Sequence, residues 1–151
     1  LKLSKKKDFL ECFNLNLISA TEIIRASFEK LKENKGAIVL FSTVAARKGF
    51  TNHSIISSAK AAVEGLTVAL AAEFSPYVRV NCIAPSLSKS KMGEFLLKNE
   101  KIAEGIAKLH PLKRLGEGSD FSAIAKFLIS EESSWMTGQI IGVDGGRSAI
   151  A

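Results

Sequence analysis

The stretch IVLFSTVAARKGFTNHSIISSAKAAVEG, from Ile38 to Gly65, decides the fold of this chain. It begins with four apolar residues after Gly36, which is typical of a short strand buried on both faces. Polar residues follow from Ser42, and from about Ser54 the pattern predicts a helix of small residues with one lysine, Lys60. A strand, a hydroxyl-bearing loop and a helix place polar groups at the carboxyl edge of a parallel sheet, where open α/β folds bind ligands.

The rest of the chain repeats this alternation of strands and helices. No hairpin turn joins the predicted strands, and crossovers through helices imply parallel pairing. Gly36 is expected to end the first helix with a left-handed backbone, Asn99 to divide the helical region 91–109 into two pieces, and Ser119 to cap the last helix. We expect strands at residues 37–41, 78–84 and 139–143, and helical segments at residues 6–34, 54–74, 91–109 and 119–129.

Composition favours one globular domain and excludes several classes of protein. The 151 residues are 46% hydrophobic and 24% charged, which suits a domain with a real core. No uninterrupted apolar run long enough for a membrane span and no secretory signal pattern is visible, so we expect a cytoplasmic protein. Cys12 and Cys82 lack a metal-ligand spacing and suit buried thiols. The net charge of +6 favours solvated helix faces over a nucleic-acid patch, because no aromatic residues lie among the lysines.

The opening stretch resembles the catalytic segment of the short-chain dehydrogenase/reductase family. That family has a serine after the strand and a Tyr-x-x-x-Lys motif at the start of the next helix. Aligning the lysine on Lys60 places the tyrosine position at Ile56 and the serine position at Thr43. Asn16, within NLNLIS, corresponds to the family's active-site asparagine. The resemblance therefore implies Asn16, Thr43, Ile56 and Lys60 as the catalytic positions, with the tyrosine absent.

Later segments extend this resemblance over essentially the whole chain. RVNCIAPS, at 79–86, resembles the strand and Pro-Gly loop that contact the nicotinamide end of the cofactor, with Ser86 where glycine is usual. The segments 110–128 and 137–146 resemble the region after the substrate lid and the closing strand. The resemblance implies a three-layer Rossmann-like parallel sheet and an NAD or NADP cofactor. The implied cofactor-binding residues are Lys60, Pro85, Ser86, Leu87, Ser88 and Ser90.

The first half of that fold is not found in these residues. No Gly-x-x-x-Gly-x-Gly turn precedes a helix, and no acidic residue ends a second strand to hold a ribose. The segment Gly116-Glu117-Gly118 follows a leucine-rich loop, and we expect it to be a turn rather than a phosphate cradle. Residues 1–151 are therefore expected to form a single partial Rossmann domain, the second half of a larger protein.

The missing tyrosine leaves the proton donor open. In the family, the tyrosine protonates the substrate carbonyl, the lysine lowers its pKa and binds the nicotinamide ribose, the serine holds the carbonyl oxygen, and the asparagine positions a water. Ile56 has no proton to give, whereas Thr43 can orient a carbonyl and Lys60 can bind ribose, or protonate substrate if its pKa is depressed. His53 is an alternative proton donor, since its unperturbed pKa lies near neutrality. The other interpretation is that His53 is a loop histidine that faces solvent or caps the helix together with Ser54.

Two hypotheses for function follow. The first is an NAD(P)-dependent oxidoreductase acting on a small carbonyl or alcohol substrate with an altered proton donor. The second is a non-catalytic relative retained for nucleotide binding or as an oligomer subunit, and DNA binding is a distant third. The helix expected at 54–74 is apolar nearly all round, so we expect it to face both the sheet and a second subunit. The resemblance implies a homodimer or homotetramer.

Overall fold

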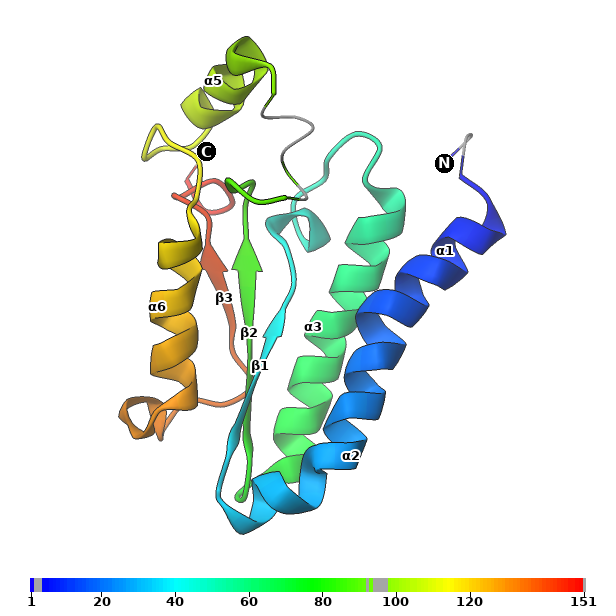
Figure 1. The fold of residues 1–151 in the computed structure, drawn as a ribbon, viewed down its shortest axis with the longest axis vertical. Helices are drawn as coiled ribbons and strands as arrows, with labels where there is room; N and C mark the ends of the chain where they lie inside the picture. The colour runs from blue at the N-terminus through cyan, green and yellow to red at the C-terminus, as the bar shows by residue number, and fades with distance from the viewer. Residues whose placement is uncertain (2–3, 92, 94–97, 151) are drawn as a thin grey trace.

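A single parallel sheet forms the middle of the molecule (Figure 1). The computed structural model describes residues 1, 4–91, 93 and 98–150. Within these residues the sheet has three strands, β1 (Ala37–Phe41), β2 (Arg79–Pro85) and β3 (Ile140–Val143), in the order β1-β2-β3. Both neighbouring pairs are parallel. The predicted α/β class with a parallel sheet is confirmed.

The central strand β2 carries the most buried part of the sheet. Val80 lies opposite Ile38 of β1, and Cys82 lies between Leu40 of β1 and Ile140 of β3. Val80 and Cys82 are both fully buried, as expected for a strand covered by helices on two faces. Strand β2 begins one residue later than predicted and includes the proline that was expected to follow it.

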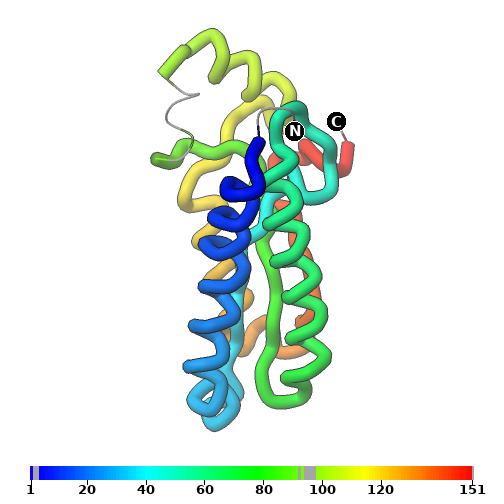
Figure 2. Tube along the Cα trace, turned by 90° about the vertical axis from the view of Figure 1, so that its right-hand side faces the viewer, coloured from blue at the N-terminus to red at the C-terminus, as the bar shows by residue number. Residues whose placement is uncertain are grey.

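One face of the sheet is covered by two long helical segments that run side by side (Figures 1 and 2). The helix predicted at residues 6–34 is one continuous run with a π-helical turn, Asn14–Ile18, inside it. The Ser19 backbone N–H bonds to the Asn14 carbonyl, five residues back. This turn separates α1 (Lys6–Phe13) from α2 (Ser19–Glu33), and the second segment is α3 (Ser54–Phe74).

The core under these helices is aliphatic, with one aromatic pair at its margin. The Phe28 and Phe74 rings, from α2 and α3, pack with centroids 4.4 Å apart. Because both rings are only partly buried, each contributes less than the roughly 1.5–3 kcal/mol of a fully buried side chain, but their contact still favours docking of the two helices. The fully packed cluster consists of Ile24, Ile38, Ala71, Val78 and Val80.

The junction between α2 and β1 corrects one expectation. The left-handed residue is Lys35, with φ of 48°, and not Gly36. A side chain at position 36 would still be crowded, because a Cβ there would lie 2.8 Å from Leu31 Cδ2 and 3.3 Å from the Leu31 carbonyl oxygen, so the Leu31 side chain would have to shift. Close approach of the backbone to α2, rather than a positive φ, therefore explains this glycine.

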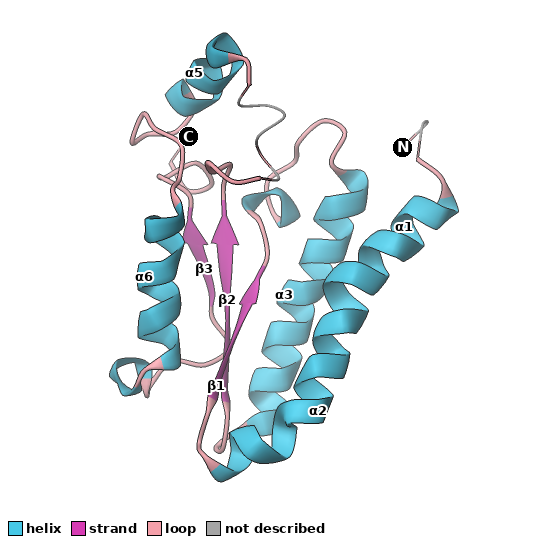
Figure 3. Ribbon diagram, in the orientation of Figure 1, coloured by secondary structure: helices cyan, strands magenta, loops and turns pink. Residues whose placement is uncertain are grey.

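The opposite face of the sheet is covered by α6 (Gly118–Ile129) (Figure 3), which completes the three layers. Its N-cap is Glu117 and not Ser119, which was the wrong prediction. The helix starts earlier because the Asp120 carboxylate accepts a 2.8 Å hydrogen bond from the Glu117 N–H. After α6 the chain forms a short 3-10 turn, Glu131–Ser133.

A smaller helix, α5 (Glu100–Lys108), lies beyond the carboxyl ends of the strands (Figure 1). Its N-cap is Asn99, whose side chain accepts a 3.2 Å hydrogen bond from the Ile102 N–H. The predicted division at Asn99 is confirmed. The other predicted helical piece of this region falls largely on residues 92 and 94–97, outside the described residues.

Helix α3 is the longest helix of the described residues. By length and composition alone it is the one helix among them that would be long and apolar enough to cross a membrane. It packs on β1 and β2 with its Ala59 and Val63 side chains buried, and α1 and the π turn contact its flank. These contacts show that one side of α3 covers the sheet. Val68 on α3 remains 51% exposed.

Candidate active site

Thr43 brings the ends of two strands together. It follows β1 with an extended backbone and caps the 3-10 turn Val44–Ala46, where its hydroxyl accepts a 3.3 Å hydrogen bond from the Ala45 N–H. The same hydroxyl donates to the Pro85 carbonyl, at the end of β2, over 3.4 Å. Two residues that the sequence places in separate motifs, Thr43 and Pro85, are therefore neighbours at the carboxyl edge of the sheet.

Lys60 reaches the same edge from α3. Its Nζ donates a 2.8 Å hydrogen bond to the carbonyl of Phe41, the last residue of β1 and two residues before Thr43. Partial burial of the ammonium lowers the pKa of Lys60, and Cys82 and Cys12 oppose this to a lesser extent. Helix α3 thus places an ammonium group with a lowered pKa at the carboxyl edge of the sheet.

Ile56 lies one helical turn before Lys60 on α3, on the same side of the helix. Its side chain is partly buried and offers no ionisable group. His53, the alternative acid, is exposed, and its Nδ1 lies 2.7 Å from the Thr51 carbonyl oxygen. It occupies the N-cap position without a side-chain capping bond. The interpretation of His53 as a solvent-facing loop histidine is therefore confirmed, and its capping role is not.

Asn16 lies in the π turn beside α3. Its Nδ2 donates a 2.9 Å hydrogen bond to the Cys12 carbonyl, within its own helical segment. The structure therefore brings Asn16 to an element that contacts the Lys60 helix, while its carboxamide nitrogen bonds locally. π turns inside α-helices are frequent at functional sites, because they re-aim side chains and displace carbonyl groups.

The loop after β2 is held by backbone hydrogen bonds to a segment near α6. The Gly116 N–H donates to the Leu87 carbonyl over 3.2 Å, and the Lys89 N–H donates to the Gly116 carbonyl over 2.9 Å. Ser88 and Gly116 form an isolated parallel bridge, and Ser90 Oγ accepts from the Gly93 N–H over 3.2 Å. Gly116 therefore belongs to the bridge, Glu117 is the N-cap of α6, and Gly118 is the first residue of that helix. The segment is not the predicted turn.

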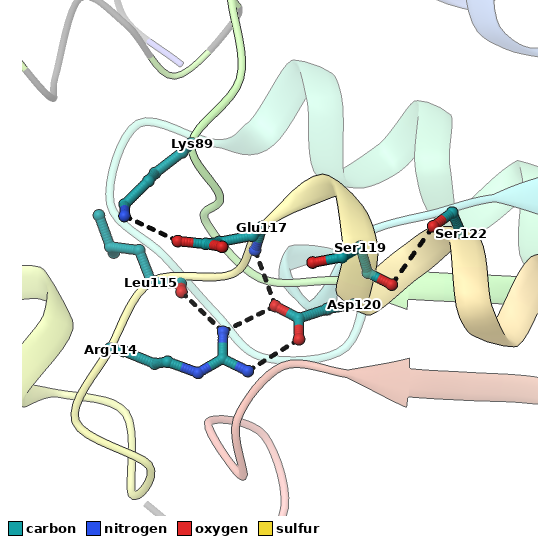
Figure 4. A network of polar contacts seen from close by, with 7 residues as sticks. All are labelled: Lys89, Arg114, Leu115, Glu117, Ser119, Asp120 and Ser122. Atoms are coloured by element: carbon teal, nitrogen blue, oxygen red, sulfur yellow. Dashed lines mark hydrogen bonds and ion pairs between the residues drawn. The ribbon is translucent and has the colours of Figure 1, made fainter.

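A cluster of charged residues stiffens this junction (Figure 4). Arg114 binds the two Asp120 oxygens with two 2.7 Å hydrogen bonds, and Lys89 donates to Glu117 over 2.8 Å. The Arg114 guanidinium and the Glu117 N–H lower the pKa of Asp120 to about 2. The bidentate geometry fixes the start of α6 relative to the loop before it.

A buried carboxylate beside Ser42, at the end of β1, was not predicted from the sequence. Glu64 of α3 is 8% exposed, accepts a 2.8 Å hydrogen bond from Ser42 Oγ and pairs with Arg47 Nε at 2.7 Å. The available signal was an acid in an otherwise apolar helix, whose only acids are Glu64 and Glu73, since a buried carboxylate needs partners. A hydrogen bond between Ser86 and the buried His110 was also missed, and no sequence pattern connects those residues.

Comparison with known proteins finds relatives along almost the whole chain. The family model described as enoyl-(acyl carrier protein) reductase matches residues 1–148. A tropinone reductase homologue of Arabidopsis thaliana, described as chloroplastic, is 36% identical over 143 residues, covering 93% of this chain and 44% of that protein. Human dehydrogenase/reductase SDR family member 4 is 36% identical over 119 residues, covering 78% of this chain and 43% of that protein. The chain thus spans about half the length of the curated relatives it matches.

Solved structures share the fold closely. ElxO with NADP bound superposes with a TM-score of 0.89 at 27% identity, covering 97% of this chain and 60% of that one. A short-chain dehydrogenase/reductase from Mycobacterium ulcerans gives the same TM-score and identity over 95% of this chain and 53% of that one. The matched sequence, the parallel sheet and the relatives agree, and the chain belongs to the short-chain dehydrogenase/reductase family.

Proposed function

We propose that the complete protein is an NAD(P)-dependent oxidoreductase that interconverts a small carbonyl compound and its alcohol. The observation that carries this proposal is the 2.8 Å bond from Lys60 Nζ to the Phe41 carbonyl, which holds an ammonium beside Thr43 at the sheet edge. The relatives described as reductases and the solved relative with NADP bound support the same class. The choice between NAD and NADP stays open.

The residues at the sheet edge fit a nicotinamide nucleotide. An ammonium has three N–H donors, and among the described residues the hydrogen bond to Phe41 uses one of those of Lys60. The remaining donors suit ribose hydroxyls, and the loop of residues 86–90 lies after the neighbouring strand β2. We assign cofactor contacts to Lys60, Pro85, Ser86, Leu87, Ser88 and Ser90. When bound, the nicotinamide supplies or accepts the hydride.

The proton is assigned to Lys60. During reduction the substrate oxygen gains an electron pair, and the ammonium gives it a proton, leaving a neutral amine that solvent reprotonates. Burial lowers the pKa of Lys60, which brings the acid closer to the working pH. The Thr43 hydroxyl turns from the long 3.4 Å contact with Pro85 to hold the carbonyl oxygen. Ile56, which we place at the tyrosine position, contributes apolar surface and no proton. Asn16 completes the proposed catalytic set from the neighbouring helix.

The test is to restore the phenol. Ile56→Tyr in the complete protein should raise turnover on a carbonyl panel by about a hundredfold or more, the usual contribution of a positioned general acid. Ile56→Phe is the matched control, because it adds the ring without the hydroxyl and should give no such gain. A variant Ile56→Tyr that binds cofactor but shows no increase over Ile56→Phe would count against this mechanism.

A second candidate is a non-catalytic member of the family that binds nucleotide or serves as an oligomer subunit. The partly buried Ile56 favours it, because the side chain one turn before Lys60 cannot transfer a proton. This candidate predicts binding of NADPH or NADH with no turnover by the parent protein on the same panel. Measurable parent turnover that Lys60→Met abolishes would exclude it.

A further inference from the structure

A buried histidine, His110, contacts the first residue of the loop that follows β2. His110 is 2% exposed and lies between α5 and α6 in the sequence. Its Nδ1 lies 2.9 Å from the Ile106 carbonyl oxygen, and its Nε2 lies 2.8 Å from Ser86 Oγ. Neither side chain takes part in the proton transfer assigned above.

The two contacts of His110 define the direction of each hydrogen bond. A carbonyl oxygen only accepts, so the Nδ1 facing Ile106 must carry the proton. In the neutral imidazole Nε2 is then an acceptor, and the Ser86 hydroxyl donates to it. The imidazole therefore links the end of α5 to the first residue of the loop through two directed hydrogen bonds.

Ser86 is well placed to transmit this restraint to the candidate active site. It directly follows Pro85, whose carbonyl accepts the hydrogen bond from Thr43. The family pattern has glycine at this position, but Ser86 is not among the described residues with a positive φ, so its side chain causes no backbone strain. Ser86 thus brings a hydroxyl to the position where the family pattern has glycine, and the buried His110 imidazole is the hydrogen-bond partner of that hydroxyl.

We infer that His110 is a positioning residue that sets the affinity for the nicotinamide cofactor through Ser86. The inference rests on the proposed function, and it adds a residue outside the family motif. Holding Ser86 in place pre-orders the loop and the Pro85 carbonyl. A loop that is ordered before binding loses less conformational freedom when the cofactor arrives, which tightens binding.

The surroundings of His110 determine which substitutions are informative. A cavity of about 150 Å³ adjoins the contact and is lined by both Ser86 and His110. Alanine at position 110 would enlarge this cavity and destabilise the fold for reasons unrelated to the loop. Phenylalanine keeps a ring of similar size without hydrogen-bonding groups, and glutamine keeps a donor and an acceptor.

The experiment is a double-mutant cycle in the complete protein, with Ser86→Ala, His110→Phe and the two combined. Cofactor dissociation constants come from titration with NADPH and NADH, and kcat, KM and the thermal midpoint are measured in parallel. Each single variant should weaken cofactor binding by about two- to tenfold, the range for one lost hydrogen bond. The double variant should be no weaker than the worse single one, because both remove the same contact. His110→Gln should restore most of the affinity, and kcat at saturating cofactor should change little in the two His110 single variants.

Three results would overturn the inference. Multiplicative losses in the double variant would show that the two residues act independently. A lower thermal midpoint with an unchanged dissociation constant would show a purely structural role. A parent protein that binds neither NADPH nor NADH would refute the proposed function and this inference together. Titration of the parent protein alone distinguishes that outcome from the first two.

Discussion

The Glu64 carboxylate of α3 accepts a 2.8 Å hydrogen bond from the hydroxyl of Ser42, the residue that immediately follows β1. Its second oxygen pairs with Arg47 Nε at 2.7 Å. Ser42 Oγ also lies 3.3 Å from the Lys60 carbonyl oxygen, one turn earlier on the helix. Ser42 thereby ties the backbone next to Thr43 to the helix that carries Lys60, so Glu64 fixes the base of the candidate active site.

Loss of the Glu64 carboxylate should destabilise the fold. Glu64→Ala leaves the buried Ser42 hydroxyl without its carboxylate partner, and we expect the free energy of unfolding to fall by about 1–3 kcal/mol in urea titrations. Glu64→Gln is the control, because its amide oxygen can still accept the hydrogen bond from Ser42, so it should lose less stability than Glu64→Ala. Equal losses in the two variants would contradict an essential role for the Ser42 contact.

The lowered pKa of Lys60 predicts a pH dependence of reduction. If the ammonium is the proton donor, kcat should decline as the pH rises through a pKa below the usual lysine value of 10.5. Lys60→Arg keeps the charge but holds its proton far more tightly, so the decline should disappear in the slower variant. An unchanged decline in Lys60→Arg would assign the titration to another group.

The same shift has a consequence for folding. Because the unfolded chain binds the Lys60 proton more tightly than the folded protein, this residue makes the folded state more stable as the pH rises from the folded pKa towards 10.5. Unfolding measured at several alkaline pH values should show this contribution in the parent and not in Lys60→Met.

The Arg114–Asp120 pair predicts an acid response. The folded pKa of Asp120 is lowered from 3.8 to about 2, so its contribution to stability is complete above 3.8 and is lost as the pH falls through about 2. NMR titration of the Asp120 carboxyl should find this pKa, and Arg114→Gln should move it towards 3.8. A pKa that is unchanged in Arg114→Gln would show that the helix start, and not the guanidinium, sets it.

Exposed apolar residues on the outer helices predict self-association. Ile23 of α2 is 67% exposed and Val68 of α3 is 51% exposed. We expect light scattering to show a homodimer or homotetramer, with these helices at one interface and β3 at another. Ile23→Glu combined with Val68→Glu should give a smaller species, whereas Ile102→Glu on α5 should not. A parent protein that is a stable monomer would contradict this expectation.

Strong boundary signals made part of the fold predictable from the sequence. Strand β1 and helix α3 begin and end as expected, because the apolar run 38–41 and the proline after α3 mark their limits. The predicted N-cap of α6 was wrong because Ser119 has the preferred side chain, whereas the helix is capped at Glu117, whose N–H bonds to the Asp120 carboxylate. A local capping box there outweighs the preference of a single residue type.

The candidate site was predictable only where one segment carried it. Thr43 and Lys60 belong to the same strand–loop–helix unit, so their common position at the sheet edge follows from the fold. The Ser86–His110 contact joins residues 24 apart, and the Ser42–Glu64 contact joins residues 22 apart. Neither spacing matches the period of a helix or a strand. Each contact depends on how the helices pack on the sheet.

The π turn at Asn14–Ile18 makes the first helix sensitive to the length of the chain. Such a turn accommodates one residue more than an α-helical turn, and each residue of an α-helix advances the side chains by about 100°. Because the π turn already absorbs the extra residue, deleting a single residue here would convert it to regular helix with α1 still in register with α2, and would change the direction in which Asn16 projects. Asn16 would then face a different neighbour although every side chain outside the deletion is unchanged. The position of this residue is thus encoded by a count of residues as much as by their identity.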